Sequence, residues 1–315
     1  MRRFKRILKW TGIVLLVFVV TISITVALRQ NIKYKRPYPA ITSTTDSAII
    51  LKGKNIIFGP AHCADCHSGV RNIDSMLALG QPVPLTGGHV FDLPIGKIYT
   101  KNITPDNETG IGLFTDAEIA RALRYGVHPD GTMIYAFMPF HNMSDEDLTA
   151  VISYLRAQKP IRSEVPDHDL NVLGNVVKAF LAKPSGPDGE PPVSVKKDTT
   201  ANYGRYIANS IANCKGCHTD RNMMTGAFTG ELYGGGLKID GLVTPNLTPD
   251  SSSRIFGWTS KMFIDRFRMG KIVPKSPMPW NSFKRMSDDE LLAIYNFLQT
   301  VKPVKTPPAS GRYKP

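Results

Sequence analysis

Apolar residues recur at helical spacing in two segments that lie far apart in the chain. Each segment places them at positions i, i+3, i+4 and i+7, which is the spacing of one buried face of an α-helix. The residues are Leu148, Val151, Ile152 and Leu155 in the first segment and Leu291, Ile294, Tyr295 and Leu298 in the second. Both patterns stop just before a Lys-Pro pair, at Pro160 and Pro303. The pattern therefore predicts one buried helix in each half, ending near those prolines.

The N-terminus carries a different pattern, because residues 10–28 contain no charged side chain. As a helix rising about 1.5 Å per residue, this stretch spans roughly 28 Å, close to the hydrocarbon core of a bilayer at about 30 Å. We expect residues 1–30 to form a cytoplasmic basic tip and a transmembrane anchor. A cleaved signal peptide is the alternative, but its apolar region is usually about 7–15 residues long and ends in a small-residue cleavage site. Thr25-Val26-Ala27 is a poor version of such a site.

The remaining chain contains an internal repeat. GKNIIFGPAHCADCH, at residues 53–67, matches GRYIANSIANCKGCH at residues 204–218. Further pairs recur in the same order: NITPD and NLTPD, FTDAEIARALRYG and WTSKMFIDRFRMG, FMPF and PMPW, MSDEDL and MSDDEL. Repetition of this length predicts two copies of one structural unit.

These matches set the predicted domain boundaries. The first domain covers residues 46–160 and the second covers residues 199–303, with a linker at 31–45 and a tail at 304–315. Residues 161–198 form the interdomain linker, because KPSGPDGEPP has the composition of a loop. The linker also holds an apolar stretch, NVLGNVVKAFL, which we expect to pack across both domains.

Helix caps are predicted in both copies. Ser144 and Ser287 fit N-cap positions, and a capping box is expected at Ser287 with a weaker variant at Ser144. The acidic residues at the third helical position are Asp147 and Glu290, Thr115 with Glu118 forms a third capping box, and Gly126 and Gly270 fit helix C-terminal positions. The predicted domains are therefore helical.

The composition changes this picture little, but the charge excludes one class of partner. Apolar residues make up 42% of the chain and charged residues 21%, as in ordinary globular proteins. The formal net charge is +13, yet nine of the 39 basic residues lie in the first 40 positions, where no acidic residue occurs. The rest of the chain carries only +4. The basic residues are concentrated beside the predicted anchor, so no nucleic-acid partner is expected.

All four cysteines lie in two copies of one motif, CADCH and CKGCH. On a helix, positions i, i+3 and i+4 share a face, so the two cysteines and the histidine of each motif point the same way. Two thiols can add to the two vinyl groups of a porphyrin, and the adjacent imidazole then reaches the iron. The motif therefore predicts two covalently bound haem c groups. The attachment residues are Cys63, Cys66, Cys214 and Cys217, and the iron ligands from the motifs are His67 and His218.

Two other uses of paired cysteines fit less well. A zinc ribbon separates its CxxC pairs by about 15–20 residues, whereas 147 residues lie between Cys66 and Cys214. A thioredoxin-like redox pair belongs to a βαβ setting, which the sequence does not show.

The orientation of the predicted anchor in the membrane is not decided by charge, because five basic residues precede the apolar stretch and four follow it. Because haem c is attached outside the bacterial cytoplasmic membrane, we expect a single-pass inner-membrane protein with its haem domains in the periplasm.

The distal iron ligands are harder to assign. No histidine follows His218, so the second haem needs a thioether, a lysine or no distal ligand, unless the first domain donates a histidine. Two methionine pairs recur, Met138 with Met278 and Met143 with Met286. Met143 and Met286 directly precede the N-cap serines. An apolar residue at this position packs against the fourth residue of the helix, so a packing role is expected for this pair. The former pair precedes prolines, which favours extended backbone, so Met138 and Met278 are the preferred candidates.

Other histidines remain candidate ligands of the first haem. They are His89, His128, His141 and His168, and none has a counterpart in the second half. His62, beside Cys63, is expected to be a loop or surface residue. Arg124 and Arg268 occupy matching positions, and we consider each either a haem propionate partner or a solvated surface residue.

Together, these motifs resemble those of one family. Its members are membrane-associated class I cytochromes c found as cytochrome subunits of periplasmic alcohol, aldehyde and gluconate dehydrogenases. The resemblance covers roughly residues 46–303 and rests on CxxCH, on YTKNITPDNETGIGLFTDAEIARALRYGV, and on MPF followed by MSDEDL. It implies an all-α fold with an N-terminal transmembrane helix and two tandem class I cytochrome c haem domains. It also implies His and Met axial ligands, here His67 with Met138 and His218 with Met278. The NxTPD loops are then expected to line the haem edge.

The resemblance implies an electron carrier rather than an enzyme. Such subunits commonly carry three haem motifs, whereas this chain has two. Iron with both axial positions filled favours single-electron transfer over catalysis. The expected partners are the membrane, a periplasmic dehydrogenase or other electron donor, and a quinone-linked or oxidase acceptor in a respiratory chain. The alternatives are a dihaem peroxidase, a thiosulfate-oxidising dihaem cytochrome, and a haem-based sensor or gas binder.

Overall fold

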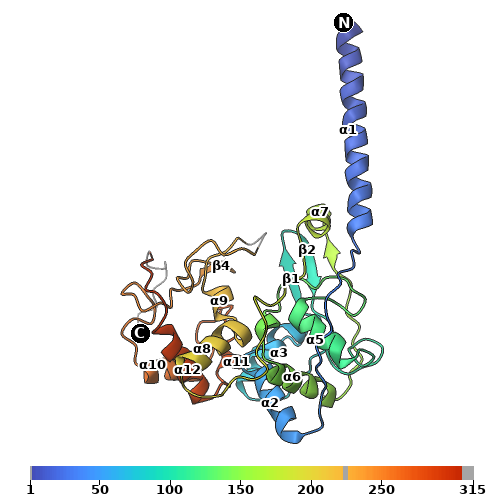
Figure 1. The fold of residues 1–315 in the computed structure, drawn as a ribbon. Coiled ribbons are helices and arrows are strands. Elements are labelled where there is room, and N and C mark those ends of the chain that lie inside the picture. Colours follow the sequence, from blue (N-terminus) through green and yellow to red (C-terminus); the bar gives the residue numbers. More distant parts are fainter. Residues whose placement is uncertain (1, 223–225, 307–315) are drawn as a thin grey trace.

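The computed structural model describes residues 2–222 and 226–306, and it consists of one long helix and a helical body. Helix α1 (Arg2–Arg29) stands away from the body, and none of its residues is buried (Figure 1). Its mean hydropathy reaches 2.6 over its most apolar window, so it is long and apolar enough to cross a membrane. Residue 1 of the predicted basic tip and residues 307–315 of the predicted tail lie outside the described residues.

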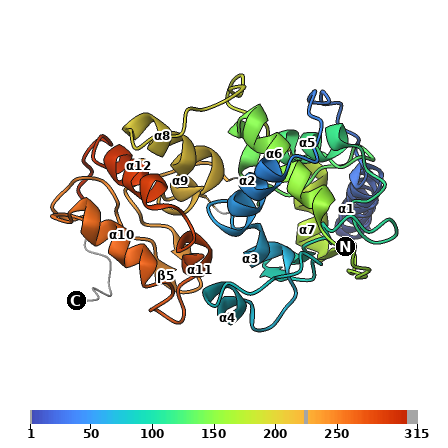
Figure 2. The ribbon, with the colours of Figure 1, turned by 90° about the horizontal axis from the view of Figure 1, so that it is seen from below.

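Two similar sets of helices make up the body. The first repeat, residues 46–160, contains α2 (Ser47–Phe58), α3 (Cys63–His67), α4 (Ile73–Ala78), α5 (Asp116–Tyr125), the short 3₁₀ helix η1 (Phe140–Asn142) and α6 (Asp145–Ala157). The second repeat, residues 199–303, contains α8 (Ala201–Tyr206), the π-helical turn η2 (Ile207–Ile211), α9 (Cys214–Cys217), α10 (Ser260–Arg268), α11 (Trp280–Phe283) and α12 (Asp288–Leu298). Figure 2 shows the two sets side by side, with α8 and α12 on one side and α2 and α6 on the other.

In each repeat, the first and last helices cross at a glycine. A Cβ on Gly53 of α2 would lie 1.9 Å from the carbonyl oxygen of Ala150 in α6. A Cβ on Gly204 of α8 would lie equally close to the carbonyl oxygen of Ala293 in α12. Only glycine permits two helix backbones to approach this closely. The repeated glycine therefore fixes the same helix crossing in both halves of the chain.

The helix caps follow the predictions. Thr115 with Glu118 and Ser287 with Glu290 form complete capping boxes, and the Ser144 side chain accepts a hydrogen bond from the Asp147 amide. Gly126 and Gly270 follow α5 and α10 with left-handed φ angles of 60° and 64°. Helices α6 and α12 end before Pro160 and Pro303, as the apolar patterns predicted.

The fold is mostly helical, but the prediction of an all-α fold was wrong in detail. The described residues include β1 (Val90–Leu93), β2 (Gly96–Tyr99) and β3 (Asp169–Leu170) in one antiparallel sheet, and β4 (Lys238–Ile239) paired with β5 (Leu242–Val243). Both hairpins lie between a CxxCH motif and an NxTPD loop. The turn of the second is Asp240-Gly241, with φ angles of 49° and 78°. Asp-Gly in such a turn is a strong hairpin signal.

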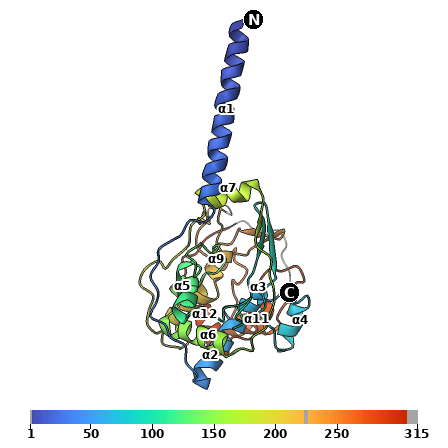
Figure 3. The ribbon, with the colours of Figure 1, turned by 90° about the vertical axis from the view of Figure 1, so that its right-hand side faces the viewer.

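The prediction for the apolar stretch of the linker was also wrong. It forms α7 (Val172–Phe180), which packs against the end of α1 and the first sheet rather than across both repeats (Figure 3). Arg29 donates from Nε to the carbonyl of Ala179 at 2.7 Å. Gly174 brings the helix close to the carbonyl of Ile95, which a Cβ would approach to 2.0 Å. These contacts fix α7 at the end of α1.

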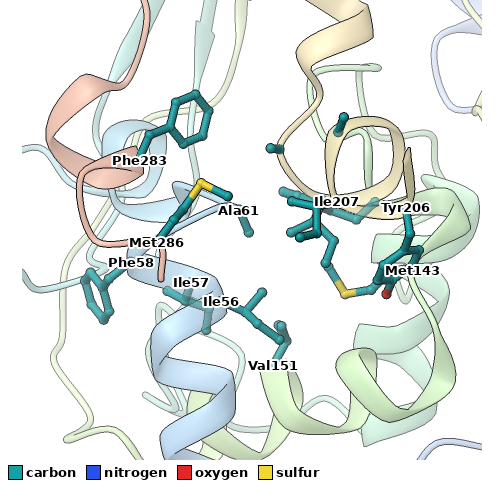
Figure 4. Packing of buried hydrophobic residues seen from close by; sticks show 14 of the residues in the cluster. Ile56, Ile57, Phe58, Ala61, Met143, Val151, Tyr206, Ile207, Phe283 and Met286 are labelled. Atoms are coloured by element: carbon teal, nitrogen blue, oxygen red, sulfur yellow. The ribbon is translucent and has the colours of Figure 1, made fainter. Parts of the chain in front are cut away.

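Both repeats share one hydrophobic core. Met143 and Met286, which precede α6 and α12, are 1% and 3% exposed, so the predicted packing role of this pair is confirmed. Figure 4 shows Met143 beside Tyr206 and Ile207 of the second repeat. Met286 lies beside Phe283 of its own repeat and Ala61 of the first repeat. Each of these methionines therefore contributes to the contact between repeats.

Candidate haem sites

Each CxxCH motif forms a short helix that follows a left-handed residue. His62 precedes α3 with a φ of 40°, and Asn213 precedes α9 with a φ of 53°. This conformation is uncommon for residues other than glycine, so its occurrence in both copies indicates a shared geometry. His67 ends α3 and His218 caps α9. The four motif cysteines are free thiols and are partly exposed.

The imidazole of each motif is fixed by a backbone carbonyl. Nδ1 of His67 lies 2.9 Å from the carbonyl oxygen of Lys101, and Nδ1 of His218 lies 2.9 Å from that of Pro245. A carbonyl oxygen only accepts hydrogen bonds, so Nδ1 carries the proton and Nε2 keeps its lone pair for a metal. Burial lowers the pKa of both imidazoles, and the carbonyl hydrogen bond partly offsets this effect.

The NxTPD loops hold these two carbonyls in place. In the first loop the Asn102 side chain accepts from the Thr104 amide at 3.0 Å and donates to the carbonyl of Ile161 at 2.9 Å. Asn246 makes the equivalent turn in the second loop and donates to the carbonyl of Val304 at 2.6 Å. Both asparagines are buried. Each loop therefore supports the residue immediately before it, which accepts the histidine hydrogen bond.

The preferred methionines lie outside regular helices, as their prolines predicted. Met138 and Met278 directly precede Pro139 and Pro279, which are the N-caps of η1 and α11. Both side chains are partly buried against the shared core. Their ligation of iron stays a prediction.

The surroundings of the cysteines favour neutral thiols. Burial raises the pKa of Cys63, Cys66 and Cys214 to about 12. Burial also raises the pKa of Cys217, but the positive charge of Arg221 opposes the effect. In residues 2–222 and 226–306, no three His, Cys, Asp or Glu side chains converge on a point that could hold a bare metal ion.

Three buried polar atoms near these residues have no hydrogen-bond partner in the described part of the chain. They are Oη of Tyr135, Nε of Arg221 and Oγ1 of Thr244. Tyr135 lies three residues before Met138, Arg221 three residues after His218, and Thr244 next to Pro245. Buried donors are normally paired, and the propionates of a haem group could accept from such donors. The residues present therefore fit covalently attached haem in both repeats.

Most of the rival histidines have partners within the protein. Nδ1 of His141 lies 3.1 Å from the carbonyl oxygen of Arg124, and Nδ1 of His168 accepts from the Tyr99 amide at 3.2 Å. His89 packs edge-on against Phe91 at 4.9 Å, and burial lowers the pKa of His128. His62 lies in the loop before α3, as expected, and is half-buried, with its ring 5.4 Å from that of Phe283 in the other repeat.

Both matched arginines have hydrogen-bond partners within the protein. Arg124 is 5% exposed and donates to Asp145 at 2.6 Å and to the carbonyl of Met143 at 2.7 Å. Arg268 donates to Asp288 and to the carbonyl of Lys284. Both guanidinium groups therefore join the end of one helix to the start of the next. The Arg268 side chain is 35% exposed and so remains partly solvated, and a contact of either arginine with a haem propionate stays a prediction.

Side-chain hydrogen bonds that were not predicted from the sequence connect the two repeats. The Asp65 side chain of the CADCH helix accepts a hydrogen bond from Ser282 of α11. On the other side of the interface, Tyr206 of α8 donates to Asp147 of α6 at 2.5 Å. Neither pair is repeated in the sequence, so the repeat alone could not reveal them. The carbonyls that accept from the two histidines could have been found from the sequence, because Lys101 and Pro245 directly precede the repeated NxTPD loops.

Comparison with known proteins identifies similar chains over most of the sequence. The fructose dehydrogenase cytochrome subunit of Gluconobacter japonicus is 28% identical over 85% of this chain and 60% of its own length. The cytochrome c subunit of the quinone-dependent alcohol dehydrogenase of Komagataeibacter europaeus is 29% identical over 87% of this chain and 60% of its own. A diheme cytochrome c-type protein of Cereibacter sphaeroides is 28% identical over 61% of this chain and 65% of its own.

These similarities confirm the resemblance predicted from the motifs. All three names denote cytochromes or cytochrome subunits. No protein-family model matches the chain. The chain spans about three fifths of the length of the two dehydrogenase subunits.

Proposed function

We propose that this protein is a membrane-anchored dihaem c-type cytochrome that transfers single electrons in a periplasmic respiratory or dehydrogenase-linked chain. The observation that carries the proposal is the repeated histidine geometry. In both copies, an imidazole that adjoins two cysteines has its Nδ1 held by a backbone carbonyl, which leaves Nε2 for a metal. The similarity to cytochrome subunits supports the same function.

In this proposal, residues 46–160 and 199–303 are two tandem haem domains. Cys63 with Cys66 and Cys214 with Cys217 attach the haem groups through thioether bonds. Iron in a bound haem cycles between its ferric and ferrous forms and so supplies the electron-transfer chemistry. The chain positions and buries each site and thereby sets its reduction potential.

Axial ligation by His67 with Met138 and by His218 with Met278 is part of the proposal. The methionines are supported by their non-helical backbone and partial burial against the core. A thioether ligand raises the reduction potential of haem iron. A second protein ligand also leaves little room for an exogenous substrate, which supports electron transfer rather than peroxidase activity or gas binding.

Contacts between the repeats support electron transfer within the molecule. The helix that carries Cys63 and Cys66 bonds through Asp65 to Ser282, shortly after Met278. A second contact joins η1 of the first repeat to η2 of the second repeat. Met138 lies shortly before η1, and Cys214 lies shortly after η2. Each methionine loop thus leads into a segment that contacts the other repeat near its CxxCH motif.

The electron donor and the membrane arrangement are also proposed. The names of the relatives support a periplasmic dehydrogenase as the donor, with a quinone-linked or oxidase acceptor downstream. Helix α1 supports a single-pass anchor in the inner membrane. Covalent haem attachment requires the body to lie on the periplasmic side.

Haem quantification and a redox titration of the purified chain test the proposal. We expect two haems per chain that resist acid-acetone extraction, and two one-electron transitions. The reduced protein should react only slowly with peroxide and should not bind carbon monoxide readily. Extractable or absent haem would contradict the attachment, and rapid peroxide turnover would instead support a dihaem peroxidase.

A further inference from the structure

Helix α7 presents an apolar face that the described part of the protein leaves largely exposed, with only Val176 partly buried. Val172, Val176 and Phe180 follow i, i+4 spacing along this face, and Leu173 adjoins them. Val172 is 82% exposed, Leu173 is 47% exposed and Phe180 is 42% exposed. Contiguous exposed apolar residues of this kind mark an interaction surface rather than an ordinary protein surface.

The opposite face of α7 fixes its orientation. Gly174 and Val177 are buried, and Gly174 faces the carbonyl of Ile95 in the hairpin of the first sheet. Lys178 is also on the side of the body, where it lines a cavity of about 530 Å³ with Asp167 and Asp169. Gly174 and Val177 therefore face the body, and the exposed side chains of Val172, Leu173 and Phe180 point away from it.

The position of α7 relative to α1 is the second observation. In Figures 1 and 3, α7 lies across the end of α1, at the edge of the body from which α1 leaves. Gln30 donates to the carbonyl of Asn175 at 3.1 Å, and the Arg29 guanidinium lies 5.5 Å from the centre of the Phe180 ring. Arg29 is also the first charged residue after the apolar stretch of α1. Phe180, at one end of the apolar face, thus lies beside the residue at which the apolar stretch of α1 ends.

We infer that α7 is an interfacial helix that embeds Val172, Leu173, Val176 and Phe180 in the surface of the bilayer that α1 crosses. This inference rests on the proposed membrane anchoring. A helix with one apolar face, lying crosswise to a transmembrane segment at its end, has the geometry of an interfacial helix. Arginine beside an aromatic ring at this level is typical of a membrane boundary, because both side chains combine apolar and polar parts.

The second contact has a mechanical consequence for the body. Residues 31–45 already bind the first repeat, through the Tyr34 amide to Gly131 and the Ser43 amide to Asp116, but α1 alone would give the body only one point of attachment to the bilayer. Embedding α7 adds a second contact on the first repeat, because the Gly174 approach and the Arg29 and Gln30 bonds hold the helix in place. The first repeat would then keep one face towards the membrane and present the second repeat to soluble or peripheral partners.

Photo-crosslinking of the full-length chain in lipid nanodiscs tests this inference. Benzoylphenylalanine replaces one residue at a time in nanodiscs of phosphatidylethanolamine and phosphatidylglycerol, and lipid adducts are measured by mass spectrometry after irradiation. The test positions are Val172 and Leu173. Val17 in the middle of α1 reports the anchor, and Met262 on α10, which is 49% exposed, is the matched control away from the membrane.

The inference expects lipid adducts at Val17, Val172 and Leu173, and at least tenfold fewer at Met262. Adducts at Val17 without adducts at Val172 and Leu173 would overturn the interfacial role and leave the anchor intact. A lack of adducts at Val17 would overturn the anchor and the interfacial role together. Because the test side chains are largely exposed, their replacement should not disturb folding, and circular dichroism of each variant checks this.

Discussion

The hydroxyl of Tyr206 lies 2.5 Å from Oδ2 of Asp147 and joins the second repeat to the first. It also accepts a hydrogen bond from the Ser144 amide at 3.0 Å, while Lys52 lies 2.7 Å from the other oxygen of Asp147. Burial, together with the negative charge of Asp147, raises the pKa of Tyr206, so the phenol remains a donor. This buried network crosses the interface at the first turn of α6, where no repeated motif predicts it.

Replacing Tyr206 with phenylalanine should weaken the contact between the repeats. Tyr206→Phe leaves the Ser144 amide and one oxygen of Asp147 without a partner, which costs about 1–3 kcal/mol of the free energy of unfolding. Chemical denaturation followed by circular dichroism measures the change. Tyr203→Phe on the same helix is the matched control, because no hydrogen bond of the Tyr203 hydroxyl is seen within the described chain. Equal losses in both variants would contradict the role of the network.

A methyl group at either helix crossing should destabilise its repeat. Gly53→Ala and Gly204→Ala place a Cβ within 2 Å of a backbone carbonyl oxygen, so the helices must separate. We expect a loss of about 3 kcal/mol or more in each variant, at the upper end of overpacking costs. Thermal unfolding monitors the effect. Gly189→Ala is the control, because a Cβ there meets nothing within 4 Å, and a comparable loss in that variant would contradict the explanation.

The proposed axial methionines can be separated spectroscopically. Met138→Ala and Met278→Ala should each remove about half of the methionine–iron absorption band and lower the reduction potential of one haem, because a thioether ligand raises that potential. Redox titration with absorption spectra measures both effects. Met143→Ala is the control, because this buried side chain should affect stability and leave the band in place. Retention of the full band in the Met138 and Met278 double variant would refute the assignment.

The asparagines of the two NxTPD loops should affect the histidine ligands indirectly. Asn102→Ala removes the acceptor of the Thr104 amide and the donor to Ile161, so the loop loosens around the Lys101 carbonyl. We expect a loss of about 1–3 kcal/mol in stability and a shift in the reduction potential of the first haem alone. Asn107→Ala, an exposed position in the same loop, should change neither quantity. An unchanged potential in Asn102→Ala would indicate a purely structural loop.

Acid stability should depend on Asp116. Burial alone would raise the pKa of this carboxyl, but hydrogen bonds from the Ser43 amide at 2.7 Å and from Arg156 at 2.8 Å lower it below the usual value of 3.8. The unfolded chain therefore takes up the proton at a higher pH than the folded chain. The resulting stabilisation is fully present above pH 3.8 and is lost as the pH falls through the lower folded pKa.

Asp116→Asn should accordingly lower stability at pH 7 by about 1–3 kcal/mol and reduce the slope of stability against pH below pH 4. Denaturation curves between pH 2.5 and pH 7 provide the measurement. Asp92→Asn, on the exposed part of β1, is the control for the loss of one carboxylate. A slope that is the same in Asp116→Asn and in the unchanged protein would rule out this source of acid sensitivity.

Much of the helical framework could be predicted because it depends on local signals. Serine, threonine and glycine caps are recognised from a few neighbouring residues, and Thr115, Ser287 and Gly126 all took their expected places. The repeat added a second copy of each signal. The Asp240-Gly241 turn was also a local signal, but no strand was predicted from it.

The contacts that required three-dimensional placement could not be predicted in the same way. Arg124 and Arg268 looked like ligand-binding or surface residues because their partners, Met143 and Lys284, lie 16 or more residues away. The apolar stretch that forms α7 was expected to pack across both domains, because sequence alone could not place it at the end of α1. Pairing of Tyr206 with Asp147 depends on docking of the two repeats, which the repeat within each half does not specify.

The shared core has a consequence for the origin of the chain. Met143 and Met286 occupy the same position in their repeats, and each is buried at the contact between them. In an isologous, two-fold contact, the same position of each partner lies at the interface. An ancestor with a single copy of the motif could have buried this apolar surface by pairing with an identical molecule. Gene duplication and fusion would then have converted a dimer into one polypeptide, after which Tyr206 and Ser282 were free to diverge on their separate sides.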